Sequence, residues 1–136
     1  MSILSDASLV RTAANITTVL FALVIFLQIL LAAGILPVSM AWGGQYTDLT
    51  TTLRFASLAA AFILLLFIYV IRRRAGLMDG ASITTAIKIA AWVITGFMAL
   101  NTLGNITSQS MGEKILFTPI TFVLAVLCFF ISLSKT

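Results

Sequence analysis

Two asparagines at the end of a long apolar stretch have the clearest chemical potential in this sequence. Asn101 and Asn105 lie four positions apart in "LNTLGNITSQS" (100–110), so a helix would place them one turn apart on one face. One further helical turn would bring Ser108 to the same face. Amides and hydroxyls exchange hydrogen bonds but do not titrate near neutral pH. The pattern therefore predicts a site for hydrogen bonding rather than for acid–base catalysis.

Other polar residues are expected to gather around these amides at the outer surface of a membrane. We group them as one candidate binding surface: Trp42, Gly43, Gly44, Gln45, Arg54, Asn101, Asn105, Ser108 and Glu113. Trp42 has the amphipathic ring that settles at a membrane–water boundary, and Gly43 permits a close backbone approach. We expect Arg54 to pair with Glu113 or to hydrogen-bond the asparagine amides. The surface either binds a ligand or only caps helices and closes the bundle, and the sequence leaves both interpretations open.

The other reactive residue types do not form a catalytic site. The chain contains no histidine, which removes the commonest proton shuttle and metal ligand. Its four carboxylates lie near loops or termini, and the single cysteine, Cys128, stands alone in an apolar stretch. No nucleophile and base occur at a spacing that would bring them together. We therefore predict no enzyme activity, no catalytic residue, no metal site and no cofactor.

The elements that must position these residues are membrane-spanning helices. Hydrophobic residues make up 61% of the 136 residues and charged residues only 9%, against about 25% charged residues in a typical soluble domain. Charge-free stretches at 12–47, 55–71, 89–112 and 115–134 approach or exceed the roughly 17–25 residues that cross a bilayer. The first is too long for one span, so its later part is expected to be a loop. We predict one all-α domain over 1–136, an integral membrane four-helix up-down bundle with spans at 13–36, 53–71, 83–103 and 115–134.

The first span is expected to remain in the protein rather than to be removed as a signal peptide. Its apolar core at 19–36 is longer than the roughly 7–15 residues of a signal-peptide core. Gln28 is the one strongly polar residue inside it. Because an amide in hydrocarbon needs a hydrogen-bond partner, we expect Gln28 to face another helix.

Small residues in the second span predict close helix packing. Ala56 and Ala60 form one pair of small residues four positions apart, and Ser57 and Ala61 form a second. Such pairs let helix backbones approach closely within a membrane. Threonines at 50–52 are candidates to cap the start of this span.

The starts of the later spans are less clearly marked. Ser82, the last residue of the turn at 78–82, is a candidate cap for the third span. The fourth span begins either at Thr118 and Pro119, with the threonine as cap, or about a turn earlier near Glu113. In the second case Pro119 would kink the helix. The sequence leaves this choice open.

The distribution of basic residues predicts which way the spans run. With an even number of spans, both termini share a side with the connection between the second and third spans. That side carries Arg11, Arg72, Arg73, Arg74 and Lys135, with Lys88 just inside the third span. The opposite side carries only Arg54 and Lys114. Because basic residues are enriched in cytoplasmic loops, we predict cytoplasmic termini, and we attribute the net charge of +4 to this bias rather than to nucleic-acid binding.

Several short motifs give the chain a family resemblance. They are "AWGG" at 41–44, "LRFAS" at 53–57, "LNTLGN" at 100–105 and "TP" at 118–119. Together they resemble a group of uncharacterised small bacterial four-span membrane proteins. The resemblance covers most of the chain. It implies the architecture and a place in the bacterial inner membrane, and it implies no chemistry.

The function predicted from the sequence is that of an interaction or accessory subunit. Its helix faces and polar outer surface would contact membrane lipid and either another membrane protein or a second copy of the chain. Binding of a lipid or another small amphipath at the outer surface is a variant of this interpretation. The alternative is a homo-oligomeric small-solute channel or transporter. That alternative lacks an obvious polar route, because Gln28 and scattered threonines such as Thr95 are the polar residues within the spans.

Overall fold

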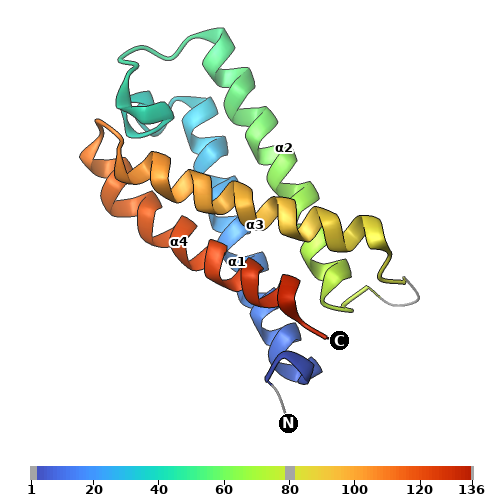
Figure 1. Ribbon diagram of the computed structural model, residues 1–136. Helices are drawn as coiled ribbons and strands as arrows, with labels where there is room; N and C mark the ends of the chain where they lie inside the picture. Colours follow the sequence, from blue (N-terminus) through green and yellow to red (C-terminus); the bar gives the residue numbers. More distant parts are fainter. Residues whose placement is uncertain (1–2, 79–81, 136) are drawn as a thin grey trace.

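The fold is built from long apolar helices. The computed structural model describes residues 3–78 and 82–135. Within these residues the chain forms four α-helices and no strand: α1 (Ala7–Ala33), α2 (Thr51–Arg74), α3 (Thr85–Ile106) and α4 (Met111–Leu133) (Figure 1). Short 3-10 turns, η1 (Ile3–Ser5), η2 (Val38–Met40) and η3 (Trp42–Gly44), accompany them. Each α-helix is long and apolar enough to cross a membrane, which confirms the predicted helical architecture at this level.

Local capping explains where α1 and α2 begin and end. The α1 helix begins at Ala7 rather than near 13, because the Asp6 carboxylate accepts the N–H groups of Ser8 and Leu9. It ends at Gly34, whose φ of 81° gives the left-handed conformation that terminates many helices. The hydroxyl of Thr50 caps α2, as predicted.

The starts of α3 and α4 differ from the predictions. Thr84, not Ser82, caps α3 by accepting the N–H of Ile87, and positions 79–81 of the predicted turn lie outside the described residues. Ser110 caps α4, which therefore begins at Met111 and contains Pro119 in its interior. The prediction that Thr118 caps this helix is thus wrong, and its alternative, an earlier start, is the one observed. The proline ring has no N–H to donate to the preceding turn.

Each helix buries one narrow stripe and leaves the rest of its apolar surface outside. On α4 the buried stripe includes Phe117, Thr121, Leu124, Cys128 and Ile131, with alternating spacings of four and three residues. That spacing keeps one face of a helix against its neighbours. Only 22% to 33% of the most apolar window of each α-helix is buried. Helices that are apolar on all sides need hydrocarbon around them, so the exterior is suited to a bilayer.

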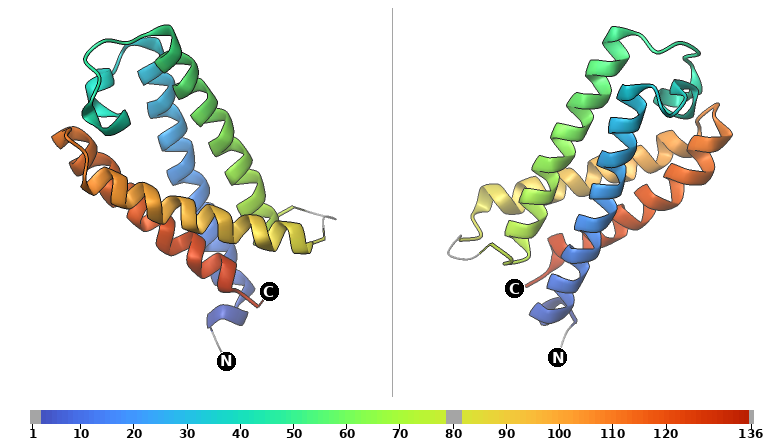
Figure 2. Two further views of the ribbon diagram at one scale, coloured as in Figure 1. Left: turned by 45° about the horizontal axis from the view of Figure 1, so that its top comes forward. Right: turned by 180° about the vertical axis from the view of Figure 1, so that it is seen from behind.

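The helices pair as two antiparallel hairpins within the described residues. The α1 helix packs along α2, and α3 packs along α4, whereas contacts between the hairpins are fewer and lie mainly between α1 and α4. Figure 2 shows that the hairpins converge at the end that carries both termini, which we call the terminal end. They diverge toward the opposite end, which carries residues 34–50 and 107–110 and is called the loop end below.

Arginine side chains tie the helices together at the terminal end. Arg74 is buried, and its Nη2 donates to the backbone carbonyls of Ser132 (3.3 Å) and Ser134 (2.7 Å). Arg72 donates from Nη1 to Oδ1 of Asn15 on α1 (3.0 Å). The "RRR" sequence at 72–74 is therefore part of the packing as well as a cluster of charge.

Candidate functional site

The segment that connects α1 to α2 also contacts the other hairpin at the loop end. Residues 34–50, which we call the bridge loop, leave α1 and reach the turn between α3 and α4 before entering α2 (Figure 2). The carbonyl of Gly43 accepts the N–H of Gln109 (3.0 Å), and the N–H of Gly43 donates to Oε2 of Glu113 (3.3 Å). Gly44 lies so close to this turn that a Cβ there would be 2.5 Å from the backbone nitrogen of Ser110. The bridge loop therefore holds the diverging hairpins at a fixed separation.

The bridge loop contains an unusual backbone conformation. Trp42, Gly43 and Gly44 have φ values of 54°, 76° and 72°, so all three residues are left-handed. Two glycines adopt this conformation without a steric penalty, but a tryptophan does not. A non-glycine residue held there costs on the order of 1–3 kcal/mol, and such residues cluster at functional sites. The strained conformation of Trp42 therefore suggests that the space beside it is a functional site.

That space is a pocket between the hairpins, which we call the hairpin pocket. Its volume is about 810 Å³, within the range of roughly 300–1,000 Å³ that is common for small-ligand sites. Its polar lining comes from α1, α3, α4 and the bridge loop: Gln28, Trp42, Gly43, Gln45, Asn101, Asn105, Glu113 and Thr121. Its apolar lining includes a row of small residues on α2, Ala56, Ala59 and Ala60, together with Ile63, Leu64, Phe97 and Met98.

Asn105 is anchored by α4 and Asn101 by its own helix, rather than by the bridge loop. Asn105 donates from Nδ2 to Oγ1 of Thr121 (3.2 Å), and Thr102 donates to the same oxygen (3.1 Å). Asn101 donates from Nδ2 to the carbonyl of Phe97 (2.8 Å). These bonds fix both amides on the α3 wall of the pocket. They use one hydrogen of each amide nitrogen and leave the second hydrogen and the Oδ1 oxygen of each side chain.

Gln28 lacks the partner that its place in a span led us to expect. Its Oε1 atom is buried and has no hydrogen bond within the part of the chain that the structure describes. The side chain lines the hairpin pocket instead of bonding to another helix. Leaving a buried amide oxygen unsatisfied costs about 1–3 kcal/mol. A ligand that donates a hydrogen bond in the pocket would offset this cost.

Three residues of the predicted surface lie outside the pocket lining. Arg54 pairs with neither Glu113 nor the asparagines, because its Nη1 donates to the carbonyl of Ala32 at the end of α1 (3.3 Å). Ser108 lies beyond the end of α3, where its hydroxyl accepts the N–H of Ser110. Gly44 packs against the α3–α4 turn. The structure brings the other predicted residues, including Gln28, together around one pocket.

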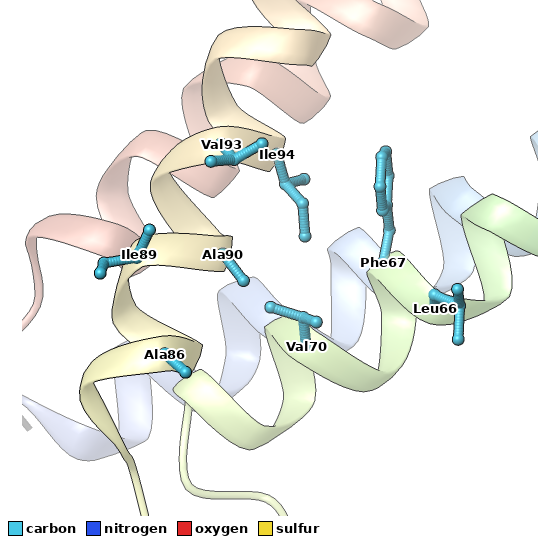
Figure 3. Close-up of a pocket in the computed structure, with 8 residues that line it drawn as sticks. All are labelled: Leu66, Phe67, Val70, Ala86, Ile89, Ala90, Val93 and Ile94. Atoms are coloured by element: carbon cyan, nitrogen blue, oxygen red, sulfur yellow. The ribbon is translucent and has the colours of Figure 1, made fainter.

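A second hollow continues along the line between α2 and α3. This seam groove has a volume of about 490 Å³ and is lined by Leu66, Phe67, Val70, Ala86, Ile89, Ala90, Val93 and Ile94 (Figure 3). All its lining side chains are apolar. The ring of Phe67 meets the ring of Phe97, which lines the hairpin pocket, edge to face at a centroid distance of 5.4 Å. This aromatic contact separates the polar pocket from the apolar groove.

The sequence did not reveal the contribution of Thr121 or of the alanines on α2. Glu113, Phe117 and Thr121 follow one another at helical spacing, so an earlier start for α4 would have placed them on one face. Ala56 and Ala60 were interpreted as a packing face. They line the pocket instead, while Ser57 and Ala61 are buried in the bundle. Small side chains at these positions leave the volume open.

The polar side chains of the hairpin pocket exchange hydrogen bonds, and one of them, Glu113, is a carboxylate. Among the described residues, no group of three or more His, Cys, Asp or Glu side chains is placed to hold a metal ion. The chain matches no family model, no curated protein and no solved structure among those compared with it. Its function is therefore argued from the pocket itself.

Proposed function

We propose that this protein binds an amphipathic, lipid-like molecule within the membrane. The observation that carries the proposal is the hairpin pocket, which joins a polar region of amides and one carboxylate to an apolar wall of α2. An amphipath needs both surfaces at once. Its polar head would lie among Gln28, Asn101 and Glu113, and its chain would lie along α2 toward the seam groove.

The gap between α2 and α3 provides a route from the bilayer. These helices contact each other far less than either contacts its hairpin partner, and the pocket and the groove both lie between them. A lipid could enter sideways through this gap without crossing the polar loops. Lateral entry is suited to a ligand that is already dissolved in the membrane.

We further propose that the loop end faces away from the cytoplasm. The proposal rests on the bias of basic residues toward the terminal end, where Arg72, Arg73 and Arg74 close α2. It places the head of the ligand near the outer surface of a bacterial inner membrane. The family resemblance of the "AWGG" and "LNTLGN" motifs supports this location.

Binding accounts for the polar groups better than conduction does. Gln28 and Asn101 each lie roughly 8 Å from the loop end of their helices, at 1.5 Å per residue. Beyond them, the seam passes the Phe67–Phe97 contact into a groove without polar side chains. A small-solute channel would need an assembly that supplies a separate polar route.

In the proposed accessory role, the protein binds a lipid and could then contact a second membrane protein. The small residues of α2, which predict close packing against another helix, are not free to contact a second protein. Ser57 and Ala61 are buried within this chain, and Ala56 and Ala60 line the pocket. A second membrane protein would therefore contact other faces. A lipid-loaded protein of this kind could present its ligand to such a partner.

Filling the pocket tests the proposal directly. Ala60→Phe adds a ring on the α2 wall, whereas Ala99→Phe adds the same ring on an exposed position of α3 outside the pocket. We expect native mass spectrometry of the protein extracted with its own membrane lipid to show a bound amphipath in the wild type and in Ala99→Phe. We expect that adduct to be lost in Ala60→Phe. Equal retention by all three proteins would show that lipid binds only nonspecifically to the outer faces.

A further inference from the structure

The hairpin pocket contains a carboxylate without a positive partner. Glu113 is buried in the first turn of α4, where its Oε2 accepts the N–H of Gly43. Its other carboxylate oxygen, Oε1, accepts no hydrogen bond or ion pair within the described chain. Oε1 is not among the buried unpaired atoms of the described residues, and Glu113 lines the pocket, so a complementary group placed there can reach this oxygen.

The nearby basic side chains point elsewhere. Arg54 is exposed and donates to the carbonyl of Ala32, and Lys114 is exposed beside the start of α4. Neither lines the pocket, and no other lysine or arginine of the described residues does so. A phosphate or carboxylate headgroup placed there would face Glu113 without a counter-charge.

The uncharged polar groups of the pocket can accept hydrogen bonds as well as donate them. Asn101 and Asn105 each use one amide hydrogen within the chain, so the Oδ1 oxygen and one N–H of each side chain remain for a ligand. The Oε1 atom of Gln28 is buried and has no partner in the described chain. Trp42 adds an aromatic face, which attracts an ammonium group placed within about 6 Å of its centre. Because the amides can serve a donating or an accepting head, the carboxylate of Glu113 and the indole face of Trp42 decide the preference, and both favour a donating or positively charged headgroup.

We infer that the hairpin pocket selects amphipaths with an amine or hydroxyl headgroup, prefers the amine, and rejects phosphate and carboxylate headgroups. This inference rests on the proposed function and adds to it the class of the ligand. Glu113 is the residue that determines the preference for charge, and the amide oxygens of Asn101 and Asn105 accept the head's remaining hydrogens.

Three probes with the same chain and different heads test the inference. The full chain in detergent micelles is mixed with equal amounts of oleylamine, monoolein and oleic acid, and the adducts are measured by native mass spectrometry. Adducts that Ala60→Phe abolishes are counted as pocket-bound. We expect oleylamine to exceed oleic acid by about tenfold or more, since a desolvated charge pair contributes at least about 1.4 kcal/mol.

Charge variants in the pocket make the test specific. Glu113→Gln keeps an oxygen for the N–H of Gly43, so we expect it to fold and to lower the ratio of oleylamine to monoolein by about tenfold. Asn101→Lys places a cation on the α3 wall and should admit oleic acid. Thermal unfolding of each variant in the same detergent checks that the fold is kept.

The outcomes separate the headgroup inference from the proposed function. If oleic acid binds the pocket as well as oleylamine does, or if Glu113→Gln leaves the ratio unchanged in a folded protein, the headgroup inference is wrong and lipid binding stands. If no probe gives an adduct that depends on Ala60, both the inference and the proposed function are wrong. Selection of the amine that is lost in Glu113→Gln supports both.

Discussion

Gly44 is the residue at which a single added methyl group should do the most damage. A Cβ there would lie 2.5 Å from the backbone nitrogen of Ser110, and the φ of 72° also disfavours a side chain. Gly76 is a matched control, because its φ is 76° but a Cβ would meet nothing within 4 Å. We expect both alanine variants to lose about 1–2 kcal/mol from the left-handed conformation. Gly44→Ala should lose about 1–3 kcal/mol more from overpacking.

Unfolding of both glycine variants in mixed micelles, followed by circular dichroism, measures this difference. Equal losses for Gly44→Ala and Gly76→Ala would mean that the bridge loop does not press against the α3–α4 turn. The expected result would instead show that the loop and the turn form one rigid unit.

At the scale of the helix, Thr121 connects α4 to α3. Its hydroxyl oxygen accepts hydrogen bonds from Thr102 and Asn105, and its own hydrogen goes to the carbonyl of Phe117. Side-chain hydrogen bonds between membrane helices contribute about 0.6 kcal/mol each on average. Thr121→Val keeps the shape and removes the acceptor, so we expect a loss of about 1 kcal/mol in unfolding free energy.

Thr12→Val is the control for this prediction, because the hydroxyl of the exposed Thr12 bonds, within the described residues, only to the carbonyl of Ser8 in its own helix. Denaturant titration in micelles should show almost no change for Thr12→Val. A Thr121→Val protein as stable as the wild type would indicate that the α3–α4 pairing does not depend on this cluster. Freeing Asn105 should also loosen the α3 wall of the pocket.

The helices themselves were predictable from the sequence, whereas their ends and the pocket were not. Long charge-free stretches identify spans because few other structures tolerate them. The ends depend on side-chain caps such as Asp6, Thr84 and Ser110, which compete with neighbouring candidates in the sequence. The pocket arises from the angle between the hairpins, which no local pattern encodes. The sequence therefore indicates which polar residues surround the pocket, but not which hydrogen-bond partners they have.

At the scale of the whole molecule, the orientation in the membrane can be measured with single cysteines. Ser39 is exposed in η2 of the bridge loop, and Ser82 is exposed just before the start of α3, at the terminal end. Cys128 is fully buried, so the wild-type protein gives the background. In intact cells we expect a membrane-impermeant maleimide to label Ser39→Cys but not Ser82→Cys. Ser82→Cys should react only after lysis, and the reverse pattern would place the pocket in the cytoplasmic half of the bilayer.

The contacts of the bridge loop have a consequence for biogenesis. Gly43 bonds to Gln109 and Glu113, which are synthesised long after it. When the first hairpin enters the membrane, Trp42 and Gly43 have no partner to hold their left-handed conformation, and Gln28 faces lipid. The bridge loop reaches its final shape only when α4 has been inserted. Assembly of the pocket is therefore the last step of insertion. A nascent chain that stops before α4 would lack the second hairpin's partner helix and would expose the unpaired polar groups of the pocket to quality control.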